Sequence, residues 1–325
     1  MPPGQELLHT ARRDDADAAL LATPGVAPFS WRRLLRALRD PDLEILEVAE
    51  PLWVGEWVRA LRYIALAKAM RVVRRRRVAV ATYAIENLDV RDRLRRPARL
   101  ALGVSLLALD AVVFGTTGAA ENYRRTFPRS LRRTRHTVLT PRLDECPVCP
   151  PREAPREPTV LFLGTPSERK GFGVLMRAWE LSGAVSRGWR LVVADPSGSG
   201  EREPLPPGVS VTVDPPRSAV HEMLCAGAVV AMPSVRQPGW REQIGLPLVE
   251  GLTHGCRVVT TTETGLADDL REHPLVELTT PGDAASLADG LRRAMESTAT
   301  AVPGRRGHTK SDVVAWWRAA CALAR

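Results

Sequence analysis

A proline-rich segment divides this chain into two halves, each of which alternates strand-like and helix-like stretches. Residues 144–158 contain five prolines in fifteen positions, and proline is disfavoured inside helices and central strands because it lacks a backbone donor. On both sides of this segment, short apolar runs alternate with amphipathic stretches. This alternation predicts parallel sheets covered by helices on both faces. The 325 residues are enough for two domains of ordinary size.

The expected elements follow from apolar periodicity and from capping and turn residues. In the first half we expect strands at residues 17–23, 43–48, 78–83, 111–115 and 136–140, and helices at 31–39 (with Ser30 as its cap), 52–73 and 94–109. In the second half we expect strands at 159–163, 190–194, 209–213, 228–232 and 257–261, and helices at 172–181, 218–225, 247–254, 284–297 and 311–323.

Two carboxylates eight positions apart, Glu242 and Glu250, flank a predicted helix start in the second half. Pro247 is tolerated in the first turn of a helix, and Gly255 stands where the helix should stop. A helix N-terminus suits an anion such as a diphosphate, and carboxylates accept hydrogen bonds from sugar hydroxyls. The residues therefore predict a nucleotide-sugar site, although the pair taken alone is also compatible with two solvated carboxylates.

A glycine-bounded loop after the predicted strand 159–163 supports this interpretation. It runs from Gly164 to Gly171, contains the cations Arg169 and Lys170, and precedes an amphipathic helix. A strand, a glycine-bounded loop and a helix in this order are typical of a phosphate-binding arrangement.

Residues 159–295 resemble the donor-binding domain of retaining group-1, or GT4-like, glycosyltransferases. The matching pieces occur in the family's order: the loop ending in Lys170-Gly171, Ala231-Met232-Pro233-Ser234, the glutamate pair, Gly255-Cys256-Arg257-Val258-Val259, and Thr264-Gly265-Leu266. The resemblance implies the GT-B fold, in which two Rossmann-like domains with parallel sheets face each other across a cleft. The implied division is an acceptor-side domain at 1–143, a linker at 144–158, a donor-binding domain at 159–307, and a helix at 308–325 packing back toward the first domain.

The resemblance also implies residue roles. Glu242 is the catalytic residue, contacting the transferred sugar near the reacting carbon, and Glu250 accepts from the ribose hydroxyls. Lys170 neutralises the leaving diphosphate, and Arg169 compensates for Thr165, which stands where the family often has arginine. The residues implied for donor binding are Gly164, Arg169, Lys170, Ile244, Gly245, Leu246 and Glu250.

The first half departs from the family's pattern. Relatives often have a glycine pair after the first strand, where this chain has only Gly25, and a histidine after the strand that here spans 78–83. Tyr83, Glu86 or Asn87 is the alternative polar contact, and an ordinary strand end is the competing interpretation.

The function expected from the resemblance is transfer of a sugar, of hexosyl type, from a nucleoside-diphosphate donor to a hydroxyl acceptor with retention. The departures leave open a non-catalytic nucleotide-sugar-binding protein of GT-B type, and the charge leaves open a basic membrane-surface adaptor. We expect no cofactor beyond the donor substrate.

The positive charge is concentrated in the first half. Residues 1–150 contain 26 Lys and Arg against 17 Asp and Glu, whereas residues 151–325 contain 20 of each. The segment 53–77 ends in Arg74 to Arg77 and predicts either a basic amphipathic helix on an anionic membrane or a core helix with a solvated basic face. The charge favours an acidic or lipid-linked acceptor. Nucleic acid is not expected, because no motif accompanies the charge.

The expected location is the cytoplasm, with a peripheral position at the inner face of the membrane as the extension suggested by charge. The start of the chain has no basic and apolar regions of a signal peptide. Five cysteines, an odd number, argue against a disulfide framework. Cys146 and Cys149 have the spacing of a zinc half-site, but no second pair and no two histidines stand at metal-ligand spacing. We therefore expect two linker thiols and no protein-bound metal.

Overall fold

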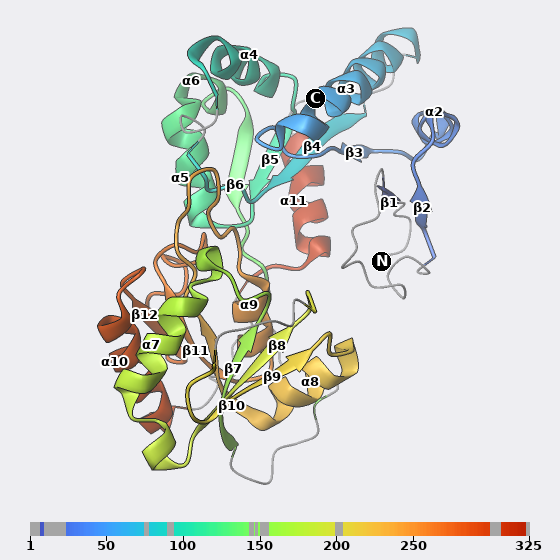
Figure 1. Ribbon diagram of the computed structural model, residues 1–325. Coiled ribbons are helices and arrows are strands. Elements are labelled where there is room, and N and C mark those ends of the chain that lie inside the picture. The colour runs from blue at the N-terminus through green and yellow to red at the C-terminus, as the bar shows by residue number, and fades with distance from the viewer. Residues whose placement is uncertain are drawn as a thin grey trace.

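The computed structural model of the protein has two α/β domains, each built on its own parallel sheet (Figure 1). It describes residues 7–9, 24–74, 78–89, 94–142, 146, 149, 156–198, 204–299 and 307–322. Two short strands, β1 (Leu7–His9) and β2 (Val26–Pro28), form a separate parallel pair. The strand expected at 17–23 lies outside the described residues.

The first domain contains a four-stranded parallel sheet in the order β3-β4-β5-β6. Its strands are β3 (Ile45–Glu47), β4 (Ala79–Ala84), β5 (Ala111–Phe114) and β6 (Arg135–Val138). Its helices are α2 (Trp31–Arg39), α3 (Val54–Arg74), α4 (Arg96–Leu106), α5 (Thr117–Thr126) and α6 (Pro128–Leu131). The central strands are buried almost throughout, as expected for a parallel sheet covered on both faces.

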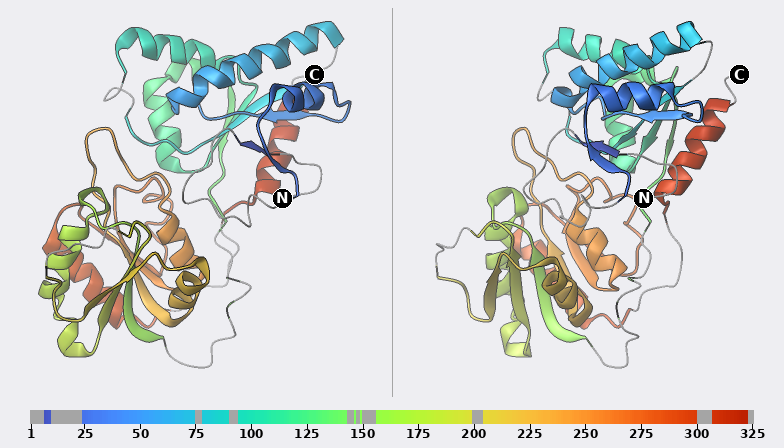
Figure 2. Two further views of the ribbon diagram at one scale, coloured as in Figure 1. Left: turned by 45° about the vertical axis from the view of Figure 1, so that its right-hand side comes forward. Right: turned by 90° about the vertical axis from the view of Figure 1, so that its right-hand side faces the viewer.

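The C-terminal helix α11 (Lys310–Ala322) covers one face of this first sheet. Because successive side chains of a strand point to opposite faces, Val80 faces the cluster of α2 to α5, while Ala79 and Ala81 face α11. The small alanines leave room for the indole of Trp317, which is 1% exposed. Figure 2 shows α11 running beside the first domain, away from the second.

The second domain contains a six-stranded parallel sheet in the order β12-β11-β10-β7-β8-β9. The strands are β7 (Glu157–Leu163), β8 (Arg190–Asp195), β9 (Val209–Val213), β10 (Gly227–Met232), β11 (Arg257–Thr261) and β12 (Val276–Thr279). Helices α7 (Phe172–Ser182) and α10 (Ala284–Glu296) cover one face, and α8 (Arg217–Ala226) and α9 (Leu246–Thr253) cover the other. The short 3-10 helices η2 (Glu168–Lys170) and η3 (Val185–Arg187) flank α7.

The expected strands and helices within the described residues are present, with ends shifted by a few residues. The Ser30 hydroxyl caps α2 by accepting from the Arg33 amide, as predicted. Helices α5 and α6 and strand β12 were not expected. The α5 segment has no strong apolar periodicity, and it starts at a Thr116 cap and buries Tyr123 in the core.

Among the described residues, the structure has no helix that combines the length and the apolar character needed to cross a bilayer.

Candidate functional site

The strand order of the second sheet changes direction between β7 and β10. From β7 the chain adds β8 and β9 on one side, and from β10 it adds β11 and β12 on the other. In open parallel sheets, ligands bind outside the carboxyl ends of the strands at such a point. The loops that leave these two ends are residues 164–171 and 233–245. The loop predicted to bind phosphate and Glu242 therefore lie at the same edge of the sheet.

The two loops are in direct contact. A side chain at Gly171 is impossible there, because its Cβ would lie 2.0 Å from the carbonyl oxygen of Pro233. The amide of Val235 donates to the carbonyl of Arg169 over 2.9 Å. At the start of the same loop, the amide of Gly164 still bonds to Ala194 of β8. The loop is thus fixed at both ends, and the cations between them are held close to Glu242.

Glu242 receives two hydrogen bonds from these loops. The Lys170 Nζ donates to its Oε2 over 2.6 Å, and the Ser234 hydroxyl donates to the same oxygen over 3.0 Å. The side chains of Lys170 and Glu242 are only 17% and 12% exposed. A largely desolvated ion pair of this kind is positioned more firmly than a surface pair.

Trp240 holds the cations of the loop 164–171. The Arg169 guanidinium lies 4.9 Å and the Lys170 Nζ 5.6 Å from the centroid of its ring. Both distances are within the range of a cation–π interaction. Arg169 itself is exposed. The contact with Trp240 thus keeps this exposed charge at the site.

The helix α9 begins directly after Glu242. Gly245 occupies its N-cap with φ of 80°, a left-handed conformation that suits glycine. The carbonyl of Ile244 accepts from the Thr264 hydroxyl over 2.8 Å, while the Leu246 side chain is 67% exposed. The N-terminal amides of α9 therefore lie at the end of the loop that contains Glu242.

Glu250 has different partners. It lies one turn into α9, where its carboxylate forms an ion pair with Arg217, the first residue of α8. Its side chain is 21% exposed. The Glu250 backbone carbonyl accepts from the ring Nδ1 of His254 over 2.7 Å. Glu250 is thus part of a contact between α8 and α9, next to the loop that contains Glu242.

The first domain contacts the second through the residues after β4. The Asn87 side-chain amide donates to the backbone carbonyl of Glu242 over 2.8 Å, and the Gln243 side-chain amide donates to Glu86 over 3.2 Å. Tyr83, by contrast, faces its own domain, where its hydroxyl donates to the carbonyl of Leu139. Of the three polar residues proposed to replace the family's histidine, Glu86 and Asn87 face the second domain and Tyr83 does not.

Glu50 fixes the backbone of the segment after β4 that makes this contact. Its buried carboxyl accepts from the amide of Ile85 over 2.7 Å, from the amide of Glu86 over 3.1 Å, and from the Tyr123 hydroxyl over 2.9 Å. Burial raises the pKa of Glu50 from 4.5 to about 7, against the opposing effect of these hydrogen bonds. A single carboxyl therefore fixes the backbone at the carboxyl end of β4.

The structure brings most of the predicted site residues together. Lys170, Arg169 and Glu242 interact directly or through Trp240, and Ile244, Gly245 and Leu246 form the adjoining start of α9. Gly164 lies at the start of the same loop, and Glu250 faces α8 instead. Sequence reasoning missed Trp240 and Glu50 as site residues. The aromatic residue two positions before Glu242 was a usable signal for the first, whereas the burial of Glu50 depends on tertiary contacts.

Comparison with protein families finds a match within the second domain. Residues 157–297 match the model of the family described as glycosyl transferases group 1. This segment begins with β7 and ends just after α10, and it contains every residue of the site described above except those of the first domain. The predicted resemblance of this segment to group-1 glycosyltransferases is confirmed, whereas its retaining, GT4-like character stays a prediction.

Comparison with solved structures identifies the fold of both domains. HepE of Anabaena in complex with UDP superposes with a TM-score of 0.57 at 15% identity, covering 90% of this chain and 76% of that one. HepE in complex with UDP-glucose gives 0.56 at 16% identity, covering 95% and 85%. A UDP-forming trehalose-phosphate synthase of Burkholderia xenovorans gives 0.56 at 14% identity, covering 89% and 73%. No curated protein sequence matches the chain. The predicted GT-B fold is confirmed by these likenesses.

Replacing Glu50 by Gln should remove a pH dependence of stability. Because the folded carboxyl has a pKa of about 7 and an ordinary carboxyl one of 4.5, the folded state binds more protons between these values. Stability is therefore highest below this window and falls as pH rises through it. Urea unfolding should show wild type losing about 2–3 kcal/mol relative to Glu50→Gln between about pH 5 and about pH 8. The exposed Glu121→Gln control should keep the wild-type slope, and a Glu50→Gln slope equal to that of wild type would refute the assignment.

Proposed function

We propose that this chain, whose second domain matches group-1 glycosyl transferases, transfers a hexose from a nucleoside-diphosphate donor to a hydroxyl acceptor with retention of anomeric configuration. The observation that carries the proposal is the Lys170–Glu242–Ser234 arrangement beside the N-terminus of α9, at the point where the strand order reverses. The family match supports the transferase activity. Uridine is our choice of base, because structural neighbours were solved with UDP and UDP-glucose.

The chemistry requires stabilisation of a departing diphosphate and of a sugar that gains positive charge. As the bond between the sugar's anomeric carbon and the diphosphate breaks, negative charge grows on the diphosphate. Lys170, Arg169 and the amides at the start of α9 are the groups that stabilise it. The acceptor oxygen bonds to the anomeric carbon and passes its proton to an oxygen of the departing diphosphate. The cations thus act on the transition state more strongly than on the bound donor.

Glu242 is assigned to the transferred sugar. In the structure its carboxylate bonds to Lys170 and Ser234. In the proposed complex the diphosphate draws the Lys170 ammonium, and sugar hydroxyls donate to the carboxylate in its place. Asn87 fixes the Glu242 backbone from the first domain, so the position of this carboxylate depends on the approach of the two domains. Domain closure would also exclude water and limit hydrolysis of the donor.

The direct test separates an enzyme from a non-catalytic binding protein of the same fold. Nucleoside diphosphates and their sugars are screened by thermal shift, because a bound ligand stabilises the folded state by mass action. Each stabilising sugar nucleotide is then assayed for release of free nucleoside diphosphate, with and without hydroxyl acceptors. Binding with release supports the transferase, binding without release in any condition supports the binding protein, and the absence of any stabilising nucleotide would overturn both.

Glu250→Ala should weaken binding of UDP. If the carboxylate accepts from the ribose hydroxyls, its loss removes a charged hydrogen bond that contributes about 1.5–3 kcal/mol, or roughly 10-fold to 150-fold in affinity. Isothermal titration calorimetry measures the change. Glu222→Ala on the exposed side of α8 is the matched control and should bind as wild type does. Equal affinities of Glu250→Ala and the control would remove Glu250 from the site.

Lys170→Ala should lose activity while the protein stays folded. The loss of a cation that faces growing negative charge should lower kcat/KM by about 100-fold to 1000-fold. Arg169→Ala should lose less, because its exposed guanidinium lies over Trp240. Arg177→Ala, on the exposed side of α7, removes a cation outside the site and should keep wild-type kinetics. Full kcat/KM in Lys170→Ala would refute the diphosphate assignment.

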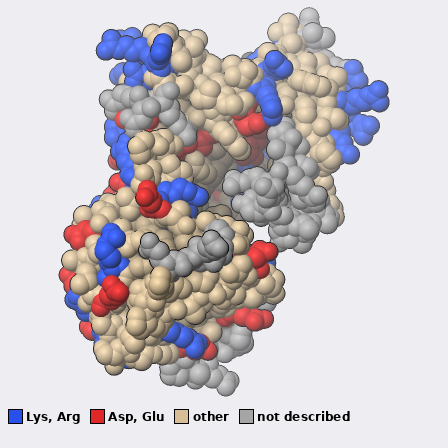
Figure 3. All heavy atoms as spheres, viewed as in Figure 1, with Lys and Arg blue, Asp and Glu red and all other residues tan. Residues whose placement is uncertain are grey.

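A second proposal concerns the surface of the first domain. Helix α4 exposes Leu100 at 72% and Val104 at 67%, and it packs on α6, where Arg129, Arg132 and Arg133 line one surface hollow. Lys and Arg side chains gather on this part of the molecule in Figure 3. Exposed apolar side chains beside arginines fit an anionic bilayer surface. We therefore propose a cytoplasmic protein that docks on the inner face of the membrane and takes an acidic or lipid-linked acceptor.

Helix α3, for which the sequence suggested membrane contact, packs on the core of the first domain with one of its sides. Trp57, Ala60 and Ile64 are buried in the first domain, and Lys68 is paired with Asp110. Its opposite side exposes Val58 and basic side chains. Arg75, Arg76 and Arg77 lie outside the described residues.

Replacing Arg129, Arg132 and Arg133 together by Gln should weaken binding to vesicles that contain phosphatidylserine. Each arginine near an anionic surface contributes about 1 kcal/mol, and the binding should fall as salt rises. Cosedimentation measures the bound fraction. The triple variant Arg271→Gln, Arg292→Gln and Arg293→Gln removes the same charge from the second domain and should bind as wild type does. Equal sedimentation of wild type with neutral and anionic vesicles at low salt would refute the proposal.

A further inference from the structure

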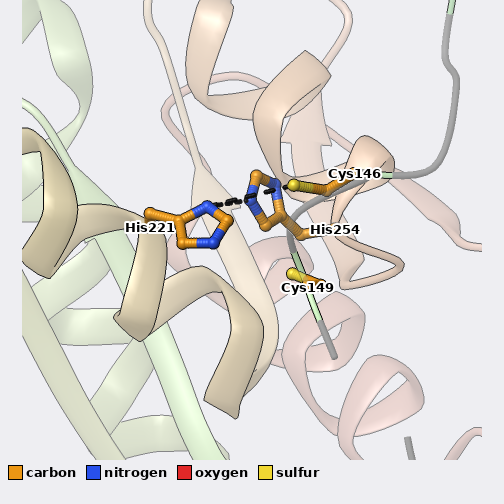
Figure 4. Close-up of side chains that lie close together, drawn as sticks. All are labelled: Cys146, Cys149, His221 and His254. Carbon is orange, nitrogen blue, oxygen red and sulfur yellow. Dashed lines mark hydrogen bonds between the residues drawn. The ribbon is translucent and has the colours of Figure 1, made fainter. Parts of the chain in front are cut away.

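Two cysteines of the linker and two histidines of the second domain converge at one place (Figure 4). Cys146 and Cys149 come from the proline-rich segment, His221 from α8, and His254 from the residue after α9. One ligand atom of each residue lies within 4.8 Å of the others. The histidines are 33 positions apart in the sequence, yet their ring nitrogens are 3.0 Å apart. No two histidines stand at metal-ligand spacing in the sequence, and this pair is assembled by the fold instead.

His254 is oriented as a ligand. Its Nδ1–H donates to the backbone carbonyl of Glu250 over 2.7 Å, which leaves the lone pair of Nε2 directed at the cluster. A metal-binding histidine generally donates its other ring N–H to a carbonyl or carboxylate in this way, and the bond fixes tautomer and ring orientation.

His221 presents its Nδ1 to the same point. This nitrogen lies 3.0 Å from His254 Nε2 and 3.9 Å from Cys146 Sγ. Without a cation, His221 Nδ1 and His254 Nε2 can be joined only by one hydrogen bond, in which one nitrogen donates a proton to the lone pair of the other. A cation between the two nitrogens would accept both lone pairs. The other ring nitrogen of His221, Nε2, lies 3.4 Å from Cys225 Sγ. Ligands of tetrahedral zinc are roughly 3.3–3.8 Å apart when the bonds are about 2.0–2.3 Å long, so the cluster needs only small side-chain movements.

We propose that Cys146, Cys149, His221 and His254 bind a zinc ion that fastens the interdomain linker to the second domain. Two thiolates and two neutral imidazoles are a donor set that zinc prefers, and four protein ligands leave no position open for a substrate. The site is therefore structural. The backbone supports the same arrangement, because the Cys146 amide donates to the carbonyl of Thr253 over 2.7 Å. The inference is independent of the proposed transferase activity.

A disulfide joins Cys149 and Cys225 in the structure, although the odd cysteine count argued against a disulfide framework. The fold places α8 against the linker. The Cα atoms of Cys149 and Cys225 are therefore 6.1 Å apart, a normal separation for a disulfide. The disulfide and the zinc ion compete for the Cys149 sulfur. The zinc site therefore belongs to the chain in which the disulfide between Cys149 and Cys225 is reduced. A test requires a reductant.

The experiment measures the metal content of the untagged full-length chain, purified with a non-chelating reductant. Mass spectrometry of the metal should find about one zinc ion per chain. Replacement by Co²⁺ should give the visible bands of tetrahedral cobalt and a thiolate-to-cobalt charge-transfer band. Cys146→Ser and His254→Gln should each lose stoichiometric zinc. The matched controls Cys321→Ala, on α11, and His136→Gln, on β6, should keep it.

Two results would overturn the proposal. One is a folded wild-type chain that binds neither added zinc nor cobalt although thiol titration of the denatured sample counts all five cysteines as reduced. The other is zinc content in Cys146→Ser and His254→Gln equal to that of the controls. If either variant fails to fold, the cobalt spectrum of wild type still decides, because thiolate and imidazole ligands in tetrahedral geometry produce bands that adventitious surface binding does not.

Discussion

The parallel pairing of β7 with β10 is the constraint on which the rest of the site depends. It joins residues that are 69 or 70 positions apart in the sequence and buries both strands between layers of helices. Their carboxyl ends therefore release the loops 164–171 and 233–245 at the same edge. The close approach of Gly171 to the Pro233 carbonyl then sets the distance between the loops, and the ion pair of Lys170 with Glu242 follows from it. Gly171, required by the close approach of two backbone segments, thus determines where the side chains of Lys170 and Glu242 meet.

The sequence predicted the architecture well because buried parallel strands are apolar runs. It predicted the donor domain because the motifs of that domain occur in order. The prediction failed for elements whose formation depends on a tertiary contact. The segment of α5 is held by the burial of Tyr123 rather than by its own periodicity. The same limit applies to the site. The spacing of Glu242 and Glu250 suggests a shared role but cannot show that one pairs with Lys170 and the other with Arg217, residues brought near by strand order.

The first domain departs from the family's pattern at the place where it touches the second. Instead of a histidine after β4, the chain has a loop whose backbone is fixed by the buried Glu50 carboxyl. That loop carries Asn87, which is 1% exposed and donates to the Glu242 carbonyl. The position of Glu242 is therefore determined from both domains: its side chain by Lys170, its backbone by Asn87. A polar contact with the neighbouring domain thus stands where the family pattern led us to expect a histidine.

Helix α9 links this site to the cysteine–histidine cluster. At its first turn it is fixed by Gly245 and by the bond from Thr264 to Ile244. At its end, His254 donates to the carbonyl of Glu250, the residue whose side chain pairs with α8. The linker joins at the same end through the Cys146 amide. A cation bound by the cluster would therefore restrain the end of α9 and hold Cys146 and Cys149 against the second domain.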